Sequence, residues 1–220
     1  MKREIEKRRG GRTKMFIPER FVEEQVEELQ KKLGAGKAVI AVTGGVDTTL
    51  AAVVTHRAIG KRMLAVLIAD GLMRGDEVAR ITGFFEMSAM QIRTVDAAME
   101  FDNALNGITE REELRRVYQN AFYSVLGRVV REEKAMYLVQ GTTAADVVRT
   151  EEGVELPDDL FEEIRLIDSR RNGLTIVEPL RKLNKHEVLK LARSLGLPPE
   201  FVDRQPFPVV LDMLRESLVK

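Results

Sequence analysis

The sequence predicts an α/β fold in which a doubly wound, mainly parallel five-stranded sheet carries helices on both faces. Short apolar runs without a polar face alternate with segments of helical spacing along the chain. Such a run is typical of a parallel strand covered on both sides, and its alternation with helices indicates crossover connections. With 220 residues, of which 44% are hydrophobic, the chain is long enough for one domain with a buried core.

The predicted elements alternate from the first helix onward. That helix begins at Pro18 and ends at Gly34, because its apolar residues recur on one side with glutamates opposite. Two later helices are predicted at Thr109 and Asn184, since a glutamate follows each of them three residues on, as in a capping box. The predicted strands are residues 38–42, 63–69, 90–95, 136–139 and 174–177, and the remaining helices are 50–59 and 77–87, with the Thr109 helix running through Val129 and the last helix ending near Gly196.

Three segments are expected to differ from this regular pattern. Residues 1–14 hold seven basic and two acidic residues, and we interpret them as a basic mobile tail. Within the predicted domain, residues 15–208, the acidic and polar stretch 150–172 follows the fourth strand. A long loop at that end of a strand lies where ligands bind in such sheets, so we expect a lid-like loop. Residues 209–220 are predicted to form a short C-terminal helix.

The composition excludes several classes of function. Lysine plus arginine and aspartate plus glutamate each number 35, so no field of the whole chain attracts nucleic acid or membranes. The sequence has no apolar run of about 18 residues and no signal-peptide pattern, and we expect a cytoplasmic protein without a membrane partner. Because there is no cysteine and there are only two histidines, thiol chemistry and cysteine-held metals are excluded. The metal that fits is magnesium, a hard cation held by carboxylates and phosphates.

A glycine-containing loop gives the strongest local signal for function. The segment Thr43-Gly44-Gly45-Val46-Asp47-Thr48-Thr49 lies between an apolar strand and a helix. The two glycines allow the backbone to approach a ligand, and amides at a helix N-terminus favour an anion. The threonine hydroxyls add hydrogen-bond donors, and Asp47 can hold magnesium beside phosphates. The segment therefore predicts a polyphosphate site, with an ordinary tight turn as the alternative.

This loop resembles the Ser-Gly-Gly-Val-Asp-Ser signature of the PP-loop ATP pyrophosphatases, with threonine in place of each serine. Further segments, in order over residues 17–208, are similar to the ATP-pyrophosphatase domain of the GMP synthetase branch. They are Asp70-Gly71-Leu72-Met73-Arg74, Gln140-Gly141-Thr142 with Asp146-Val147-Val148, Val177-Glu178-Pro179-Leu180-Arg181, Lys185-His186-Glu187-Val188, Leu195-Gly196-Leu197-Pro198 and Arg204-Gln205-Pro206-Phe207-Pro208. The resemblance implies a Rossmann-like sheet of the adenine nucleotide α-hydrolase-like type.

The resemblance also implies an activity. Members of the family cleave ATP between its α and β phosphates: a carbonyl oxygen of the acceptor forms an adenylate, pyrophosphate leaves, and a nitrogen or sulfur nucleophile displaces AMP. By this resemblance Asp47 and Lys185 act in catalysis, Asp47 at a magnesium ion and Lys185 facing phosphate. The residues expected to bind the nucleotide are Thr43, Gly44, Gly45, Val46, Asp47, Thr48 and Thr49 at the pyrophosphate end, Ile68, Ala69, Asp70 and Gly71 at the adenosine, and Gly141, Thr142 and Arg74 along the site.

The sequence departs from the GMP synthetase branch at several places. Arg149 stands where that branch has a glutamate, and a Lys-Ser-His-His-Asn segment is absent from residues 150–172. Val209-Val210-Leu211 replaces a glycine-rich continuation, and the sequence ends at Lys220 without the dimerisation domain of the branch. We therefore expect an unidentified acceptor other than xanthosine monophosphate. The basic residues expected to meet an anionic acceptor are Arg165, Arg170 and Arg171.

Partners and two alternative functions follow from the same features. Because the chain has no cysteine, the ammonia or sulfide must be free or come from a separate donating protein. The first alternative is a non-catalytic paralogue that binds ATP or AMP in regulation or assembly. The second is a tRNA-modifying adenylator whose residues 1–14 hold RNA. Residues 209–218 are a candidate contact for a second copy of the chain in a homodimer.

Overall fold

The computed structural model describes residues 15–73, 76–151 and 174–203, and its centre is a five-stranded sheet in which all neighbouring strands are parallel. The strand order is β3-β2-β1-β4-β5. The strands are β1 (Ala38–Ala41), β2 (Met63–Ala69), β3 (Gln91–Asp96), β4 (Tyr137–Val139) and β5 (Thr175–Val177). The helices are α2 (Pro18–Leu33), α3 (Val46–Ile59), α4 (Glu77–Met87), α5 (Ala98–Leu105), α6 (Arg111–Glu132), α7 (Ala144–Glu151), α9 (Lys185–Ser194) and α10 (Pro199–Val202).

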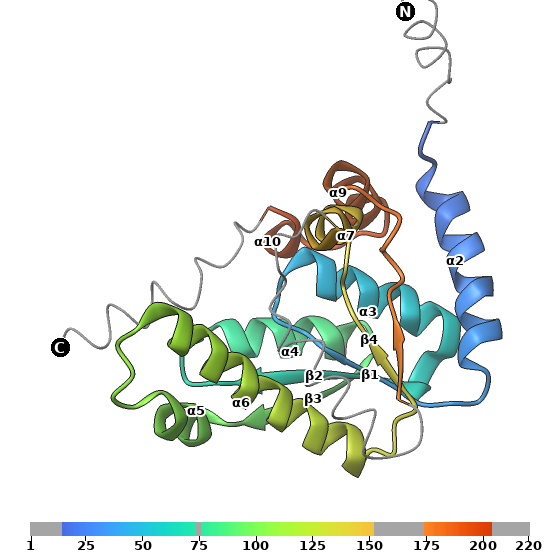
Figure 1. Cartoon of the computed structure of the whole chain (residues 1–220). Coiled ribbons are helices and arrows are strands. Elements are labelled where there is room, and N and C mark those ends of the chain that lie inside the picture. The colour runs from blue at the N-terminus through green and yellow to red at the C-terminus, as the bar shows by residue number, and fades with distance from the viewer. Residues whose placement is uncertain (1–14, 74–75, 152–173, 204–220) are drawn as a thin grey trace, which may run out of the picture.

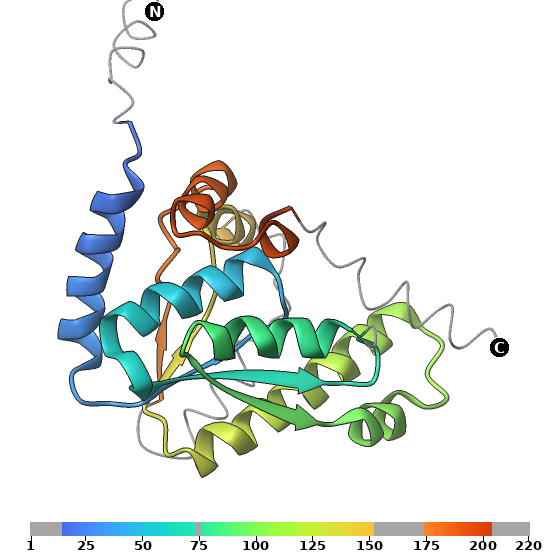
Figure 2. The same ribbon diagram turned by 180° about the vertical axis from the view of Figure 1, so that it is seen from behind.

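Helices cover both faces of this sheet (Figure 1). On one face lie α3 and α4, and α2, α9 and α10 pack against α3. On the other face lie α6 and the short α5, as the view from behind also shows (Figure 2). The predicted fold class, a doubly wound parallel sheet with helices on both faces, is therefore confirmed.

Successive side chains of the central strands enter two different cores. In β1, Ile40 packs in the core beneath α3, whereas its neighbour Val39 packs in the core beneath α6. In β2, Leu67 and Val66 divide in the same way. Because side chains alternate along a strand and both faces are covered, these strands have no polar position. This is the physical reason that their apolar runs predict a parallel sheet.

Element boundaries agree with the sequence wherever the apolar period is strong. The predicted strand 63–69 and helix 77–87 are confirmed as β2 and α4. The capping box of α9 is also confirmed, because the backbone N–H of Glu187 donates to Asn184 Oδ1 and that of Asn184 donates to Glu187 Oε2, each at 3.0 Å.

Two helix starts differ from the prediction. Helix α3 begins at Val46 rather than Leu50, because the three residues after Val46, which are Asp47, Thr48 and Thr49, are polar and hide the apolar period. The predicted capping box of Thr109 with Glu112 is wrong, since the residue that caps α6 is Glu110. The Glu110 carboxylate accepts hydrogen bonds from the N–H groups of Glu112 at 3.1 Å and Glu113 at 2.7 Å.

Three short helices, α5, α7 and α10, were not predicted, because none exceeds 8 residues and an apolar period needs a longer window. The predicted loop 150–172 begins inside α7, which extends to Glu151. Its remainder, the basic tail 1–14 and the C-terminal helix 209–220 lie outside the described residues, as does residue 208, the predicted end of the domain.

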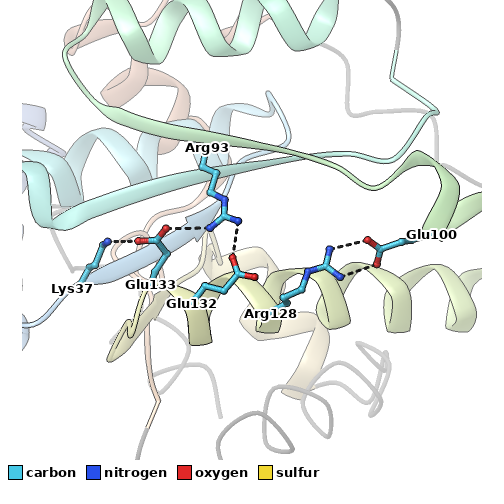
Figure 3. Close-up of polar contacts among 6 residues, drawn as sticks. All are labelled: Lys37, Arg93, Glu100, Arg128, Glu132 and Glu133. Atoms are coloured by element: carbon cyan, nitrogen blue, oxygen red, sulfur yellow. Dashed lines mark hydrogen bonds and ion pairs between the residues drawn. The ribbon is translucent and has the colours of Figure 1, made fainter.

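Ion pairs fasten the C-terminal end of α6 to the sheet (Figure 3). The Glu133 carboxylate, directly after the helix, accepts hydrogen bonds from Lys37 and from Arg93 of β3, the latter at 3.2 Å. The Arg93 guanidinium also reaches Glu132 at 2.6 Å. The hydrogen bond from the Lys37 ammonium lowers the pKa of Glu133 below its ordinary value, with a smaller contribution from Arg93.

A second set of contacts joins α6 to α5 on the same face. Arg128 donates two hydrogen bonds to the Glu100 carboxylate, at 2.8 and 3.1 Å (Figure 3). These bonds lower the pKa of Glu100. The rings of Phe101 and Tyr118 pack with their centres 4.9 Å apart. These contacts hold α6 in place along its length, and α6 packs over the ends of the strands.

Candidate functional site

The candidate site lies where the strand order reverses, between β1 and β4. Along the chain, β2 and β3 add to one side of β1, and β4 and β5 add to the other. In open α/β sheets this reversal leaves a crevice outside the carboxyl ends of the strands. A pocket of about 430 Å³ occupies this position. It is lined by Ala41, Thr43, Asp47, Thr48, Phe122, Tyr123, Leu126, Leu138, Val139, Gln140, Gly141, Thr142, Asp146, Val147, Glu178 and Arg181.

The loop between β1 and α3 forms one edge of this pocket. Gly44 has a φ of +74°, a conformation that residues with a side chain rarely adopt. Gly45 has ordinary angles, with φ −76° and ψ 152°, and a Cβ built there meets only Thr43 Oγ1, at 3.4 Å. The Thr48 hydroxyl donates to the Gly45 carbonyl at 3.3 Å. The fold therefore requires glycine at position 44 and does not require it at position 45.

Asp47 and Lys185, the two residues expected to act in catalysis, contact each other. The Lys185 ammonium lies 2.9 Å from Asp47 Oδ1 and 2.8 Å from Oδ2. Asp47 belongs to the first turn of α3 and Lys185 begins α9, so the N-termini of two helices meet at this ion pair. The side chains remain 36% and 52% exposed, respectively, so both are accessible to a ligand.

Gly141 joins the end of β4 to the start of α3. A Cβ at this position would lie 2.9 Å from both the carbonyl carbon of Asp47 and the backbone nitrogen of Thr48. Real Cβ atoms essentially never approach backbone atoms so closely, so a side chain here would displace one of the two elements. Gly141 therefore sets the position of the first turn of α3 beside the pocket.

A second, smaller pocket of about 310 Å³ lies at the ends of β1 and β2, against α6. Ile68 of β2 and Asp70, the residue after β2, line it, and Thr43 lines both pockets. Asp70 is buried, and its two oxygens accept hydrogen bonds from the Leu72 N–H at 2.9 Å and the Tyr118 hydroxyl at 2.6 Å. Burial raises the pKa of Tyr118, and the Asp70 carboxylate raises it further, so the hydroxyl keeps its proton.

Several predicted residues lie outside the two pockets or take another role. Thr49 and Val46 are buried, at 0% and 6% exposure, and neither lines a pocket. The Ala69 carbonyl accepts a hydrogen bond from the Ala97 N–H at 2.9 Å. Gly71 is exposed with a φ of +83°. Arg74 and the basic residues Arg165, Arg170 and Arg171 lie outside the described residues, and the side chain of Arg149 is not described.

Sequence reasoning missed polar groups that the fold brings to the larger pocket. Asp146 accepts hydrogen bonds from both the N–H and the hydroxyl of Thr143, each at 2.8 Å. Glu178 and Arg181 form an ion pair at 2.5 Å after β5. Asp146, Glu178 and Arg181 belong to segments that carry the family resemblance, so the sequence could have identified them. Thr143 does not belong to such a segment.

The sequence also did not predict that residues of α6 line the two pockets. Phe122 and Tyr123 of α6 line both pockets. Gln119 lines the smaller pocket alone. In the sequence the aromatic residues Phe122 and Tyr123 continue the apolar period of a long helix, and this pattern does not show that part of the helix faces a pocket.

The residues present fit a magnesium ion that arrives with a polyphosphate. Among the described residues, no three histidine or acidic side chains gather closely enough to hold a metal ion by themselves. Magnesium usually binds one or two carboxylates and completes its shell with water and substrate phosphates. Asp47 provides such a carboxylate in the larger pocket.

Comparisons with known proteins agree with this geometry. A family model described as NAD synthase matches residues 19–145. A subunit of the glutamine-hydrolyzing GMP synthase of Methanopyrus kandleri is 45% identical over 202 residues, which are 88% of this chain and 60% of that protein. The corresponding subunit from Methanocaldococcus jannaschii is 40% identical over 195 residues, with coverage of 88% and 61%. The chain spans about 60% of the length of these relatives.

Solved structures share the fold at lower sequence identity. The NH3-dependent NAD synthetase of Campylobacter jejuni, solved with a nitrate ion, superposes with a TM-score of 0.68 at 15% identity. The match covers 94% of this chain and 86% of that one. No helix within the three described ranges is long and apolar enough to span a membrane.

Proposed function

The chain belongs to the NAD synthase family of PP-loop ATP pyrophosphatases, and we propose that it binds magnesium-ATP and adenylates a carbonyl-type acceptor, releasing pyrophosphate. The observation that carries the proposal is the loop 43–49, which joins β1 to α3 at the reversal of the strand order. Asp47 and Lys185 meet beside the larger pocket at this point. In a magnesium-polyphosphate complex the positive magnesium ion would therefore meet the Asp47 carboxylate, and the negative phosphates would meet the Lys185 ammonium.

Local charge supports phosphate as the ligand of this loop. Helix N-termini carry partial positive charge, and two of them, those of α3 and α9, meet where Lys185 adds a full positive charge. Asp47 is the carboxylate that balances them in the ion pair. Gly45, the N-cap residue of α3, has no side chain that could accept a hydrogen bond from the amides of the first turn. In the proposed complex, phosphate oxygens take the place of Asp47 opposite Lys185.

Asp47 is then the residue that would hold magnesium. A bound magnesium ion offsets the charge that builds up on the departing pyrophosphate. The chain itself would position the reacting groups and neutralise the charge of the phosphates. The loop amides and Lys185 would hold the phosphates, and the residues that line the pocket would hold the reacting groups together.

The proposed reaction has two steps. In the first, the acceptor carbonyl oxygen bonds to the α-phosphorus of ATP while the bond to the bridging oxygen breaks, and pyrophosphate leaves with the electron pair. In the second, ammonia or sulfide adds to the acceptor carbon, loses a proton, and displaces AMP by breaking the carbon–oxygen bond. The chain has no cysteine that could carry sulfur or hydrolyse glutamine through a covalent intermediate. The nucleophile therefore comes from outside the chain.

The larger pocket is the proposed place for the acceptor. Arg181 lines this pocket with 55% of its side chain exposed and with its guanidinium paired to Glu178 at 2.5 Å. The relatives are named as one subunit of a glutamine-hydrolyzing enzyme, so we propose a separate subunit as the source of ammonia.

The proposal is tested by measuring AMP and pyrophosphate together. The protein is incubated with ATP, magnesium and ammonium, alone and with each of a panel of carbonyl compounds that includes xanthosine monophosphate. We expect at least one compound to produce AMP and pyrophosphate in equal amounts, and Lys185→Ala to reduce that rate by at least about tenfold. ATP binding without pyrophosphate release across the panel would instead favour the non-catalytic paralogue.

A further inference from the structure

A hydrogen bond between Asp70 and Tyr118 joins two elements at the smaller pocket. Asp70 follows β2 and Tyr118 belongs to α6, and both residues line this pocket. The Tyr118 hydroxyl donates to Asp70 Oδ2 at 2.6 Å, and the Leu72 N–H donates to Asp70 Oδ1 at 2.9 Å. Asp70 is only 8% exposed, and a carboxylate so far from water is stable only where hydrogen bonds replace the water. Each oxygen of Asp70 is therefore engaged within the protein.

The Asp70 carboxylate fixes the backbone segment 70–73, which leaves the sheet after β2. This segment turns at Gly71, whose φ is +83°, and the bond from the Leu72 N–H closes the turn. The hydrogen bond from Tyr118 ties the closed turn to α6. The segment therefore keeps one position relative to this helix.

Tyr118 is a firm anchor for the turn. Its ring packs against the ring of Phe101, with their centres 4.9 Å apart. Burial raises the pKa of Tyr118, and the Asp70 carboxylate raises it further, so the hydroxyl stays a donor. The helix that carries Tyr118 is fixed to the sheet through Glu133 and to α5 through Arg128 (Figure 3). Side chains that are held by packing on a rigid helix keep the groups around a binding site in position.

The linings of the two pockets differ in charge. Four charged residues line the larger pocket, and they are Asp47, Asp146, Glu178 and Arg181. Of the described residues that line the smaller pocket, only Asp70 is charged, and its carboxylate is engaged. The charged end of a ligand therefore suits the larger pocket, and an uncharged end suits the smaller one.

The two pockets lie close enough for one molecule to reach both. Thr43, the first residue of the loop 43–49, lines both pockets. Ile68, Met73 and Phe122 give the smaller pocket apolar walls, the last with an aromatic ring, and such walls suit a flat group. This step rests on the proposed function, in which the phosphates of ATP lie on the loop and its adenosine end reaches the smaller pocket.

We propose that Asp70 and Tyr118 are positioning residues for the adenosine end of ATP. Their hydrogen bond holds the segment 70–73 in place as a wall of the smaller pocket, and the adenosine end binds against this wall. The phosphates lie on the loop 43–49, which this hydrogen bond does not touch. Loss of the hydrogen bond therefore weakens the binding of adenosine and leaves the binding of phosphate unchanged.

The test compares a ligand that contains adenosine with one that lacks it. Dissociation constants for magnesium-ATP and for magnesium tripolyphosphate are measured by calorimetry. Tyr118→Phe keeps the ring and removes the donor, so one oxygen of the buried Asp70 carboxylate loses its partner. We expect this variant to bind magnesium-ATP about tenfold more weakly than the wild type, and to bind magnesium tripolyphosphate within about twofold of the wild type.

Tyr137→Phe is the matched control. It also removes one tyrosine hydroxyl, which donates to the Lys32 carbonyl at 3.0 Å. Tyr137 begins β4, at the opposite end of the strand from the pockets, and it lines neither of them. Both affinities of this variant should stay within about twofold of the wild type.

Two changes at Asp70 test the same contact from its other side. Asp70→Ala removes both hydrogen bonds and should weaken the binding of magnesium-ATP by at least about tenfold. Asp70→Asn keeps an oxygen for the Leu72 N–H and offers an amide nitrogen to the Tyr118 hydroxyl oxygen, so it should recover most of the affinity that Asp70→Ala loses. A role in stability alone would not distinguish the two ligands.

The outcomes separate this inference from the proposed function. A Tyr118→Phe protein that binds magnesium-ATP as tightly as the wild type, or that loses affinity for both ligands equally, would overturn the positioning role and leave ATP binding intact. Failure of the wild-type protein to bind magnesium-ATP, or to bind magnesium tripolyphosphate, would overturn both proposals, because both place phosphates on the loop 43–49. If Tyr118→Phe does not fold, as judged by circular dichroism, Asp70→Ala replaces it, and the same two results would overturn the inference.

Discussion

Gly44 and Gly45 are neighbours in the sequence, but the fold needs only one of them to be glycine. Gly44 has a positive φ, which a side chain would strain. Gly45 has ordinary angles and open space for a methyl group, whose nearest neighbour would be the Thr43 hydroxyl at 3.4 Å. If glycine at position 45 has a function, that function concerns what approaches the loop from outside.

Gly45→Ala should therefore separate binding from stability. The free energy of unfolding, measured by urea denaturation, should stay within about 0.5 kcal/mol of the wild type, because the methyl group meets no clash. The affinity for magnesium-ATP should fall by about tenfold, because the methyl group occupies space next to the amides that hold phosphate. Unchanged affinity in a stable variant would show that phosphates do not approach the loop at this residue.

The residues of the site differ in how far the sequence could predict them. Asp47 and Lys185 could be identified because each belongs to a segment with a recognisable pattern, and the structure brings the two into contact. Phe122 and Tyr123 could not, because their place at the pockets is a property of the packed structure and not of their spacing in a helix. Gly141 was predicted as a site residue from its segment, but its requirement for glycine could not be predicted, because it comes from the backbone of Asp47, far earlier in the chain.

At the scale of the elements, the contact between β4 and α3 sets the geometry of the larger pocket. Gly141 approaches the first turn of α3 so closely that a Cβ would lie 2.9 Å from its backbone. Packed interiors do not absorb such overlaps without strain, so the first turn of α3 and the end of β4 must separate if a side chain is introduced.

Two glycine-to-alanine changes should have opposite effects on stability. Gly141→Ala should lower the free energy of unfolding by about 1–3 kcal/mol, because it forces that overlap. Gly83→Ala, in the interior of α4 with open space around its Cβ, should raise it by about 0.5–1 kcal/mol, because alanine favours the helix. Urea denaturation measures both. Equal effects of the two changes would contradict the tight contact between β4 and α3.

The ion pairs at the end of α6 predict a dependence of stability on pH. The folded state lowers the pKa of Glu133 from its ordinary value of 4.5, so the unfolded chain binds a proton more readily. The stabilisation is complete above that ordinary value and is lost as the pH falls through the lowered pKa of the folded state. Glu133→Gln should cost about 1 kcal/mol at about pH 6, and the difference from the wild type should shrink towards about pH 3.

The control for this series is Glu86→Gln, at an exposed position of α4 with no ion pair among those of the described residues. It should change stability by less than about 0.5 kcal/mol at either pH. A cost of Glu133→Gln that stays constant between the two pH values would show that the Glu133 charge does not stabilise α6.

Long elements could be predicted from the sequence and short or polar ones could not. β2 is a continuous apolar run and α4 has a strong apolar period, and these patterns fix both ends of each element. The start of α3 was missed because three of the four residues in its first turn are polar. The cap of α6 was assigned one residue early because threonine is a preferred capping residue and glutamate is not, although Glu110 caps this helix.

At the scale of the whole molecule, the strand order explains why the functional residues meet. Asp47, Gly141 and Arg181 follow different strands, and a parallel sheet brings the carboxyl ends of all its strands to one edge. The reversal of strand order beside β1 opens a pocket at that edge, and α6 closes it from the side. The family relationship, the pocket and the paired charges of Asp47 and Lys185 all support the central proposal, the binding of magnesium-ATP.

The measurement that tests this property most directly is a calorimetric titration of magnesium-ATP into the wild-type protein and into Asp47→Asn. We expect the wild type to bind with a dissociation constant of roughly micromolar size and the variant to bind at least about tenfold more weakly. The free energy of unfolding should change by less than about 1 kcal/mol, because the Asp47–Lys185 pair is partly exposed. Absence of binding to the wild type, or equal binding to both proteins, would contradict the assignment of loop 43–49 as the site of magnesium-ATP.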